Sequence, residues 1–367
     1  MKICIFHNLK KGGALKYLIE ISRLLRQQHS VHIFSFQKNI PKQIYDKINV
    51  TKLRKTNNIF GHLYQVLFEL KHKSKKIAYK INQKKYDLIL IHHCYLTQSP
   101  YILKYLKNKK KCIYIFHEPK REFYEPTSSK HFTYRKKITR LIRSPIKFID
   151  KNNCKFAKNI VTNSYYSKFI IKKIYKKKSF VLYPGLNKKQ FKLLKTNNQK
   201  NFISIGNFTT AKGHDQSIDL LRNTKGKLTI IGKKDEDYKF ISNLSNSPKI
   251  SVSLKTKIKN KNKIKLLKKH TFYFSNQTKE PFGIATLEAT TQNCFVLGNN
   301  SGGTPEIIQH GLNGFLYPNN HKIKKKIVKS FLEKKKIHFI NNNEINWKQT
   351  TKHLLSLYHH LKNEPTE

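Results

Sequence analysis

Short apolar runs rich in β-branched and aromatic residues alternate with helical segments along almost all of the 367 residues. Runs of this kind, such as Lys2 to Phe6 and Thr271 to Ser275, are typical of buried β-strands. Strands that alternate with helices form parallel sheets, and a chain of this length can bury two separate cores. We therefore expect an α/β fold with two parallel sheets. The join is expected between Gly185 and Asn201, where the polar run K-T-N-N-Q-K interrupts the pattern.

The most specific motif is the string E-P-F-G-I at residues 280–284, between a strand ending at Ser275 and a helix that restarts at Ile284. A turn into a helix presents free backbone N–H groups and the positive end of the helix dipole. Such a terminus binds anions. A diphosphate placed there would accept hydrogen bonds from amides near Gly283, Ile284 and Ala285.

Two carboxylates accompany this turn, Glu280 in the loop and Glu288 about one turn inside the helix. A carboxylate near phosphates adds no phosphate affinity, so recognition of sugar and ribose hydroxyls is the functional interpretation. In the alternative, Glu280 is a loop charge and Glu288 a solvated helix residue. The G-G-x-x-E turn at residues 302–306, which follows a second strand at residues 295–298, favours the functional interpretation.

Several further motifs share the order found in one known family. They are the glycine turn K-K-G-G-A at residues 10–14, H-E-P at residues 117–119, Y-P-G-L at residues 183–186, the pair Lys212-Gly213, and Asn346-Trp347 with Tyr358. Together with the E-P-F-G-I string, they make the chain similar to glycosyltransferase family 4, the retaining nucleotide-sugar transferases of GT-B fold. The resemblance covers nearly the whole length.

The resemblance implies two Rossmann-like domains that face each other across a cleft. Residues 1–185 would form the acceptor-binding domain, residues 186–345 the nucleotide-sugar-binding domain, and residues 346–367 a helix that returns to the first domain. Catalytic roles are implied for Glu280, His117 and Lys212. The donor-binding residues are expected to be Gly12, Gly13, Asn207, Lys212, Phe282, Gly283, Ile284, Ala285, Glu288 and Glu306.

The expected phosphate grip departs from the family at Asn207, where relatives usually carry an arginine after the glycine. An amide donates hydrogen bonds but lacks the charge and the planar fork of a guanidinium. Lys212 would therefore offset the leaving group's charge alone or with other cations. A second departure is Asn293-Cys294-Phe295, where the family commonly has glycine and proline.

Structural interpretations stand beside the remaining functional ones. A lone histidine among 17 is usually structural, although His117 lies at a strand end, where ligands of α/β proteins collect. Gly12 and Gly13 form a tight turn in any case, and their missing side chains would also let a ligand approach. The acidic run 235–237 has a D-x-D metal-binding spacing, but acidic residues at a helix start are favoured by the dipole. We expect no metal and no cofactor.

The composition is strongly basic, with 75 Lys and Arg against 20 Asp and Glu, a formal net charge of +55. A generally basic, solvated surface is one explanation. An anionic membrane surface or an acidic acceptor is another, and residues 168–178 are a candidate basic amphipathic helix. Nucleic acid is not expected as a partner, because no nucleic-acid-binding motif accompanies the charge.

The five scattered cysteines lack a C-x-x-C pair and are expected to be buried free thiols, which fits a reducing compartment. No apolar run is long enough to cross a bilayer. We expect a cytoplasmic protein that is peripheral to the membrane's inner face.

The resulting hypothesis is a retaining hexosyltransferase that moves a sugar from a nucleoside-diphosphate sugar to a hydroxyl of a glycan or lipid-linked acceptor, in cell-surface polysaccharide or glycolipid synthesis. Two alternatives remain open. One is a nucleotide-sugar epimerase or glycan phosphorylase of the same fold, and the other is a non-catalytic basic protein that binds a membrane or nucleic acid.

Overall fold

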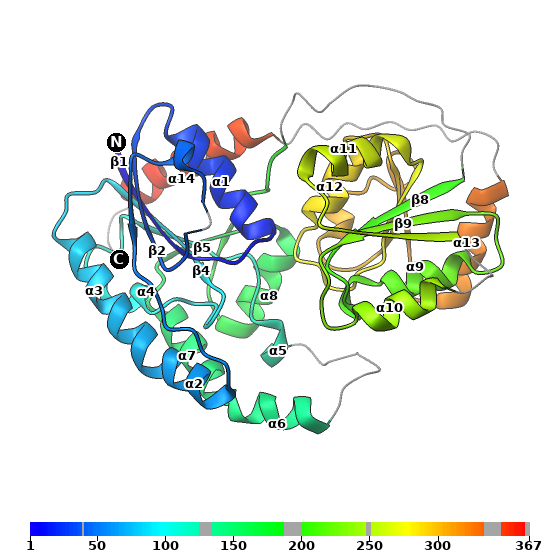
Figure 1. Cartoon of the computed structure of the whole chain (residues 1–367). Helices are drawn as coiled ribbons and strands as arrows, with labels where there is room; N and C mark the ends of the chain where they lie inside the picture. Colours follow the sequence, from blue (N-terminus) through cyan, green and yellow to red (C-terminus); the bar gives the residue numbers. More distant parts are fainter. Residues whose placement is uncertain (39, 125–133, 187–199, 247–250, 334–345, 364–367) are drawn as a thin grey trace. The chain divides into compact units, whose positions relative to one another are not determined.

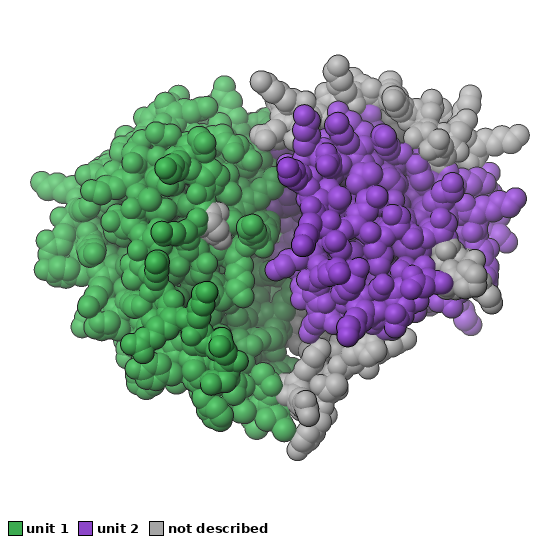
Figure 2. Space-filling view, in the orientation of Figure 1, with its two compact units in different colours: residues 1–185, 345–367 green, residues 186–344 purple. Residues whose placement is uncertain are grey.

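The computed structural model describes residues 1–38, 40–124, 134–186, 200–246, 251–333 and 346–363, with backbone only for residues 134–137. The chain divides into two compact units. Unit 1 contains Met1–Gly185 and Ile345–Glu367, and unit 2 contains Leu186–Glu344 (Figures 1 and 2). Most of the segment in which the join was expected, residues 187–199, lies outside the described residues.

Unit 1 is built on a seven-stranded parallel sheet with the order β3-β2-β1-β4-β5-β6-β7. Successive residues of its central strands enter two different cores, because neighbouring side chains of a strand point to opposite faces. Ile3 and Ile5 belong to one core, and Cys4 and Phe6 to the other. Burial on both faces explains why these strands are continuous apolar runs. The strands are β1 (Lys2–Asn8), β2 (Ser30–Ser35), β3 (Lys47–Val50), β4 (Leu88–Cys94), β5 (Cys112–Ile115), β6 (Asn159–Thr162) and β7 (Phe180–Val181).

Helices connect these strands (Figure 1). One long helix is formed from α2 (Ile59–Tyr64), a π-helical turn η2 (Gln65–Glu69) and α3 (Leu70–Asn82). The predicted basic helix is α8 (Tyr165–Tyr175), but it ends at Lys176 in a left-handed conformation, so the extension of that prediction to residue 178 was wrong. The other helices are α1 (Gly13–Leu25), η1 (Lys42–Ile44), α4 (Ile102–Tyr105), α5 (Arg121–Tyr124), α6 (Tyr134–Ile142), α7 (Ser144–Lys155) and α14 (Trp347–Asn363).

Unit 2 is built on a six-stranded parallel sheet with the order β10-β9-β8-β11-β12-β13. The ring of Phe202 stacks on Phe272 and Phe274 in one core, while Ile203 and Tyr273 enter the other. The strands are β8 (Asn201–Ile205), β9 (Lys227–Gly232), β10 (Ser251–Thr256), β11 (Phe272–Ser275), β12 (Phe295–Asn299) and β13 (Gly314–Tyr317). The helices are η4 (Thr210–Lys212), α9 (His214–Leu221), α10 (Tyr238–Ser245), α11 (Asn260–Lys269), α12 (Ile284–Thr290), η5 (Thr304–Glu306) and α13 (His321–Glu333).

The last helix, α14, belongs to unit 1 although the chain has passed through unit 2 before reaching it. It packs on α1, and the Tyr358 hydroxyl donates a hydrogen bond of 2.6 Å to the carbonyl of Asp87. The Trp347 ring packs edge-on against Tyr17, with 5.4 Å between ring centroids. The predicted α/β class, with two parallel sheets and a returning C-terminal helix, is confirmed.

The predicted state of the cysteines is also confirmed, since all five are buried and free. Among the helices that the structure describes, none combines the length and apolar character needed to cross a bilayer.

Candidate active site

The strand order of unit 2 reverses between β8 and β11, and ligands of open parallel sheets bind beside such a reversal, at the carboxyl ends of the strands. Lys212 lies in the segment after β8, and Glu280 lies in the loop after β11. Their side chains meet there, with the Lys212 Nζ 2.7 Å from Oε2 of Glu280. Gly206 makes room for the lysine, because a Cβ at residue 206 would lie 2.9 Å from its side chain.

The two glycines of the G-G-x-x-E turn hold the Glu280 loop in place. A Cβ at Gly302 would lie 2.4 Å from the carbonyl oxygen of Glu280, and one at Gly303 would lie 2.4 Å from that of Pro281. The amide of Gly303 donates a hydrogen bond of 2.7 Å to the Glu280 carbonyl. The backbones approach too closely for any side chain at these positions. Glu306 follows, half-buried, at the end of η5.

The helix start predicted after E-P-F-G is present as α12, with Gly283 at φ 99°, a conformation that favours glycine. Its first residues are Ile284 and Ala285. The ring of Phe282 is buried in the protein interior, so only its backbone can contact a ligand.

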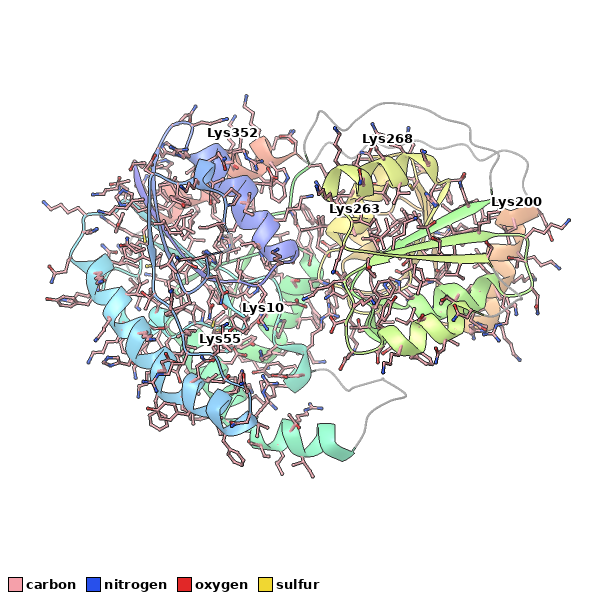
Figure 3. All side chains as sticks on the ribbon, viewed as in Figure 1. Lys10, Lys55, Lys200, Lys263, Lys268 and Lys352 are labelled. Carbon is pink, nitrogen blue, oxygen red and sulfur yellow. The ribbon has the colours of Figure 1, made fainter. Side chains whose placement is uncertain are left out.

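Glu288 is not the solvated helix residue of the alternative interpretation. It is buried, and its Oε2 lies 2.5 Å from the Nζ of Lys263 on α11. Figure 3 labels Lys263 in unit 2. Sequence reasoning missed Lys263, because it is one of many lysines in a basic run and no motif marks it. Of the three glutamates predicted for the site, Glu280 and Glu288 are therefore each paired with a lysine.

The D-x-D run holds the loop between β8 and η4. Asn207 donates a hydrogen bond of 3.0 Å to Asp235, and Asp237 accepts hydrogen bonds from the amide and the hydroxyl of Thr210. Asp237 precedes α10, but its side chain does not cap that helix. The carboxylates thus position the loop that carries Lys212, which is a different role from the helix-dipole effect expected from the sequence.

In unit 1, several histidines collect where β1, β4 and β5 end. His7, His92 and His117 are buried, and His93 is partly exposed. The ring of His117 lies 4.8 Å from that of Tyr17 and 5.8 Å from that of His93, measured between centroids. Of these residues, the sequence prediction included only His117.

These imidazoles are neutral. Burial, aided by the neighbouring His93, lowers the pKa of His7 and of His117 to about 3. Within the part of the chain that the structure describes, Nε2 of His7, Nδ1 of His92 and both ring nitrogens of His117 have no hydrogen-bond partner. Neutral imidazoles with unused donors and acceptors suit hydroxyl groups of a ligand better than charged groups.

The glycine turn before α1 is open. A Cβ at Gly12 would meet no atom within 4 Å, so packing does not require the glycine, and Gly13 is the first residue of the helix. The residues predicted from the sequence thus form two groups, one in each unit. Glu280, Lys212, Gly283 and Glu288 lie around the ends of β8 and β11, and His117, Gly12 and Gly13 lie around the ends of β1 and β5.

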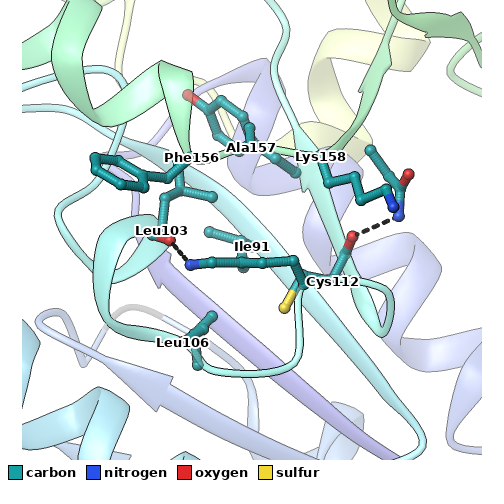
Figure 4. Close-up of a pocket in the computed structure, with 10 residues that line it drawn as sticks. Ile91, Leu103, Leu106, Cys112, Phe156, Ala157 and Lys158 are labelled. Carbon is teal, nitrogen blue, oxygen red and sulfur yellow. Dashed lines mark hydrogen bonds between the residues drawn. The ribbon is translucent and has the colours of Figure 1, made fainter. Parts of the chain in front are cut away.

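Two other features do not form sites. Among the described residues, no group of three or more His, Cys, Asp or Glu side chains is arranged to hold a metal ion. A small depression lined by Ile91, Leu103, Leu106, Cys112 and Phe156 has no space for a water molecule (Figure 4).

Two α/β units, each built on a parallel sheet, define a two-domain α/β protein with candidate ligand-binding residues at the strand ends of both units. Residues 11–190 match the description "Glycosyltransferase Family 4", and residues 187–362 match "Glycosyl transferases group 1". The chain belongs to glycosyltransferase family 4 and has the GT-B fold.

Solved structures agree with this fold over the full length. Sucrose-phosphate synthase from Thermosynechococcus elongatus aligns with a TM-score of 0.75 and 16% identity, over 98% of both chains. Anabaena HepE, in complex with UDP and glucose, aligns with a TM-score of 0.70 and 16% identity, over 98% of this chain and 99% of HepE.

Among curated proteins, the chain is similar to the α-1,3/1,6-mannosyltransferase ALG2 of Homo sapiens. The two are 26% identical over 211 residues, which is 49% of this chain and 51% of ALG2. The Mus musculus ALG2 is 26% identical over 59% of this chain and 58% of its own length. The chain therefore matches only about half the length of these curated relatives.

Proposed function

We propose that this glycosyltransferase moves a sugar from a nucleoside-diphosphate sugar to a hydroxyl of a glycan or lipid-linked acceptor, with retention of the anomeric configuration. The observation that carries the proposal is the Lys212–Glu280 pair at the reversal of strand order in unit 2. Anabaena HepE has been crystallised with UDP-glucose, which supports a nucleotide-sugar donor for a protein of the same fold.

In this proposal, the donor's diphosphate competes with Glu280 for the ammonium of Lys212. The amides of Gly283, Ile284 and Ala285 complete its coordination. Lys212 then offsets the negative charge that develops on the leaving phosphate, an effect that strengthens in a site shielded from water. Asn207 adds an amide without charge, so the lysine carries most of the electrostatic stabilisation.

The carboxylates recognise hydroxyl groups. Glu280, displaced from Lys212, accepts a hydrogen bond from the transferred sugar, and Glu288 accepts hydrogen bonds from the ribose. Glu306 also accepts hydrogen bonds from hydroxyl groups of the donor. Lys263 orients Glu288, because the two side chains are in contact and largely shielded from solvent.

Unit 1 supplies His117 and Gly12 and binds the acceptor. The neutral imidazole of His117 donates or accepts a hydrogen bond with a sugar hydroxyl. The acceptor's hydroxyl forms the new bond to the anomeric carbon on the face that the leaving group vacates. The bond to the diphosphate breaks, and a leaving phosphate oxygen takes the acceptor's proton. No enzyme carboxylate has to act as a nucleophile.

The proposal is tested by incubating the purified protein with UDP- and GDP-sugars and candidate acceptors, then determining the product's anomeric configuration by NMR. An α-linked donor should give an α-linked product. A β-linked product would contradict retention. Without an acceptor, only slow hydrolysis is expected, whereas rapid conversion to another nucleotide sugar would indicate an epimerase.

We also propose that unit 1 associates with an anionic membrane surface, in keeping with a lipid-linked acceptor and with glycolipid or cell-surface polysaccharide synthesis. Phe60, Tyr64 and Phe68 follow one another at helical spacing along α2 and η2, and are 72%, 56% and 59% exposed. Exposed lysines, Lys71 and Lys75, continue the same face into α3. Aromatic rings with flanking lysines are typical of helices that lie in a membrane interface.

Sedimentation with vesicles tests this association. The protein should bind phosphatidylglycerol vesicles and not phosphatidylcholine vesicles. Replacing Phe60, Tyr64 and Phe68 by serine should reduce binding at least tenfold, whereas Phe180→Ser, an exposed aromatic on β7, should not. Equal binding by the triple variant would contradict the proposal.

A further inference from the structure

Unit 1 contains a cavity of about 660 Å³ that none of the sequence motifs predicted. It is lined by residues that follow the carboxyl ends of four neighbouring strands, in the order β3, β2, β1 and β4. Lys52 to Asn57 follow β3, Phe36 to Lys38 follow β2, Lys10 follows β1, and Tyr95 follows β4. Strand ends of this kind form ligand sites in α/β proteins.

The lining is strongly basic. Its cations are Lys10, Lys38, Lys52, Arg54 and Lys55, and none of the described residues that line it is acidic. Figure 3 shows Lys10 and Lys55 on the ribbon of unit 1. In the described part of the chain, none of these five side chains forms an ion pair with a carboxylate. The charge is therefore available to an anionic ligand.

Local hydrogen bonds fix the segment that carries three of these cations. Lys73 donates a hydrogen bond of 2.5 Å to the carbonyl of Lys52, and the amide of Arg54 donates one of 3.0 Å to Glu69. Gln65 donates to the Arg54 carbonyl. Glu69 is thus engaged with the backbone and with Lys73, 2.6 Å away, rather than with the cations of the cavity.

The cavity also has an apolar and aromatic side, to which Phe36, Leu96 and Tyr95 contribute. The Lys10 ammonium lies 4.4 Å from the centre of the Tyr95 ring. His62, on α2, also lines the cavity, and its pKa is lowered to about 4 by burial and by the charges of Arg143, Lys120 and Lys10. The surroundings therefore carry a positive potential.

We propose that this cavity binds the phosphate group of a phosphate-bearing acceptor. A guanidinium grips phosphate oxygens in pairs, and several ammonium groups around it match a group with more than one negative charge. The apolar side then holds the part of the acceptor attached to the phosphate. This inference rests on the proposed transfer reaction and names the chemical class of its acceptor.

Binding of inorganic pyrophosphate, followed by calorimetric titration, tests the site directly. The donor site also binds diphosphates, so the titration is repeated in a Lys212→Ala background. Affinity should survive Lys212→Ala and fall at least tenfold in the triple variant Lys52→Gln/Arg54→Gln/Lys55→Gln. The altered side chains are exposed, so the fold should be unchanged, which the unfolding midpoint without ligand checks.

A charge-matched control is available in unit 2. Lys261, Lys265 and Lys268 are exposed on α11, and their replacement by Gln removes the same charge. This control should keep the affinity for pyrophosphate. The proposal would be overturned if the cavity variant bound as tightly as the wild type, if both triple variants lost affinity equally, or if Lys212→Ala alone abolished binding.

Two further ligands distinguish the source of the phosphate. A soluble hexose phosphate that competes with pyrophosphate indicates a phosphorylated glycan. A short-chain alkyl diphosphate that competes much better indicates a lipid carrier. In transfer assays, the cavity variant should raise the KM for the acceptor at least tenfold and leave the KM for the donor unchanged. If no transfer occurs but pyrophosphate binding follows these predictions, phosphate binding in the cavity is supported and the proposed transfer reaction is contradicted.

Discussion

The two units differ in whether the cations at their candidate sites are paired with carboxylates. In unit 2, the lysines at the candidate site are each in contact with a glutamate, Lys212 with Glu280 and Lys263 with Glu288. In unit 1, the cations of the basic cavity have no described carboxylate partner, and the buried histidines are neutral. Unit 2 therefore carries its own counter-charges, which a ligand has to displace. Unit 1 attracts an anion without such competition.

The largest effect is expected where the ligand and the ion pair compete. Lys212→Ala should lower the rate of sugar transfer about 100- to 1000-fold, because it removes the charge that stabilises the leaving phosphate. Glu280→Ala should lower it similarly by removing a sugar contact. Glu333→Gln, an exposed glutamate at the end of α13, should have no effect. Transfer that persists in the Lys212 variant would mean that the pair is only structural.

Variants of the Lys263–Glu288 pair allow stability and function to be tested separately. Lys263→Met should lower the free energy of unfolding by about 3 kcal/mol, because it leaves the Glu288 carboxylate in the protein interior without its counter-charge. The double variant Lys263→Met/Glu288→Leu should recover most of that stability but not the transfer activity. Urea unfolding and transfer assays on the same samples measure both. Recovery of activity in the double variant would contradict a donor-binding role for Glu288.

The fold and the motif around Glu280 could be predicted from the sequence, whereas the Lys263–Glu288 ion pair and the basic cavity could not. The alternation of strands and helices predicts both sheets, because buried parallel strands are short continuous apolar runs. The motif around Glu280 is visible because its glycines are required by close backbone contacts, such as that of Gly302 with Glu280. The contacts join separate loops, but the glycines that permit them are visible in the sequence as a residue type.

Neither Lys263 nor the cavity is marked by a residue type in this way. Lys263 is one lysine among many. It contacts Glu288 because of how α11 and α12 lie in the folded unit. The cavity's cations come from loops after four different strands, which the sheet order brings together. The same holds for His7 and His92, since the pairing of β1 with β4 places them near His117. Contacts between distant segments depend on topology, and composition does not report it.

The neutral histidines of unit 1 predict a pH dependence. The folded-state pKa of His7, His92 and His117 is lowered by burial, so their contribution to stability is present above about pH 6.5 and is lost as the pH falls below it. Between pH 7.5 and 6.0, each should cost about 0.8 kcal/mol. Asp150, whose pKa burial raises to about 6, has the opposite sign and offsets part of this loss.

The fluorescence of Trp347 can report the pH dependence of unit 1's stability, because Trp347 is the chain's one tryptophan and packs in unit 1. Its fluorescence in urea should show unit 1 less stable by at least about 2 kcal/mol at pH 6.0 than at pH 7.5, because burial also lowers the pKa of His62 and His93 to about 4. His117→Asn should reduce that difference by about 0.8 kcal/mol. His214→Asn, which removes a buried histidine of unit 2, should leave it unchanged. A midpoint independent of pH would show that the imidazoles are already charged.

The smallest effect on stability is expected at Gly12. A Cβ there meets no atom within 4 Å, so Gly12→Ala should change the free energy of unfolding by less than about 0.5 kcal/mol. Gly185→Ala is the matched contrast, since its Cβ would lie 2.1 Å from the amide nitrogen of Trp347, and it should cost at least about 2 kcal/mol. If Gly12 is kept for the close approach of the donor, the KM for the donor should rise about tenfold in Gly12→Ala while the unfolding midpoint stays constant. Unchanged kinetics would reduce the glycine turn to a connection between β1 and α1, and would leave unit 1 with its histidines and its basic cavity as ligand-binding features.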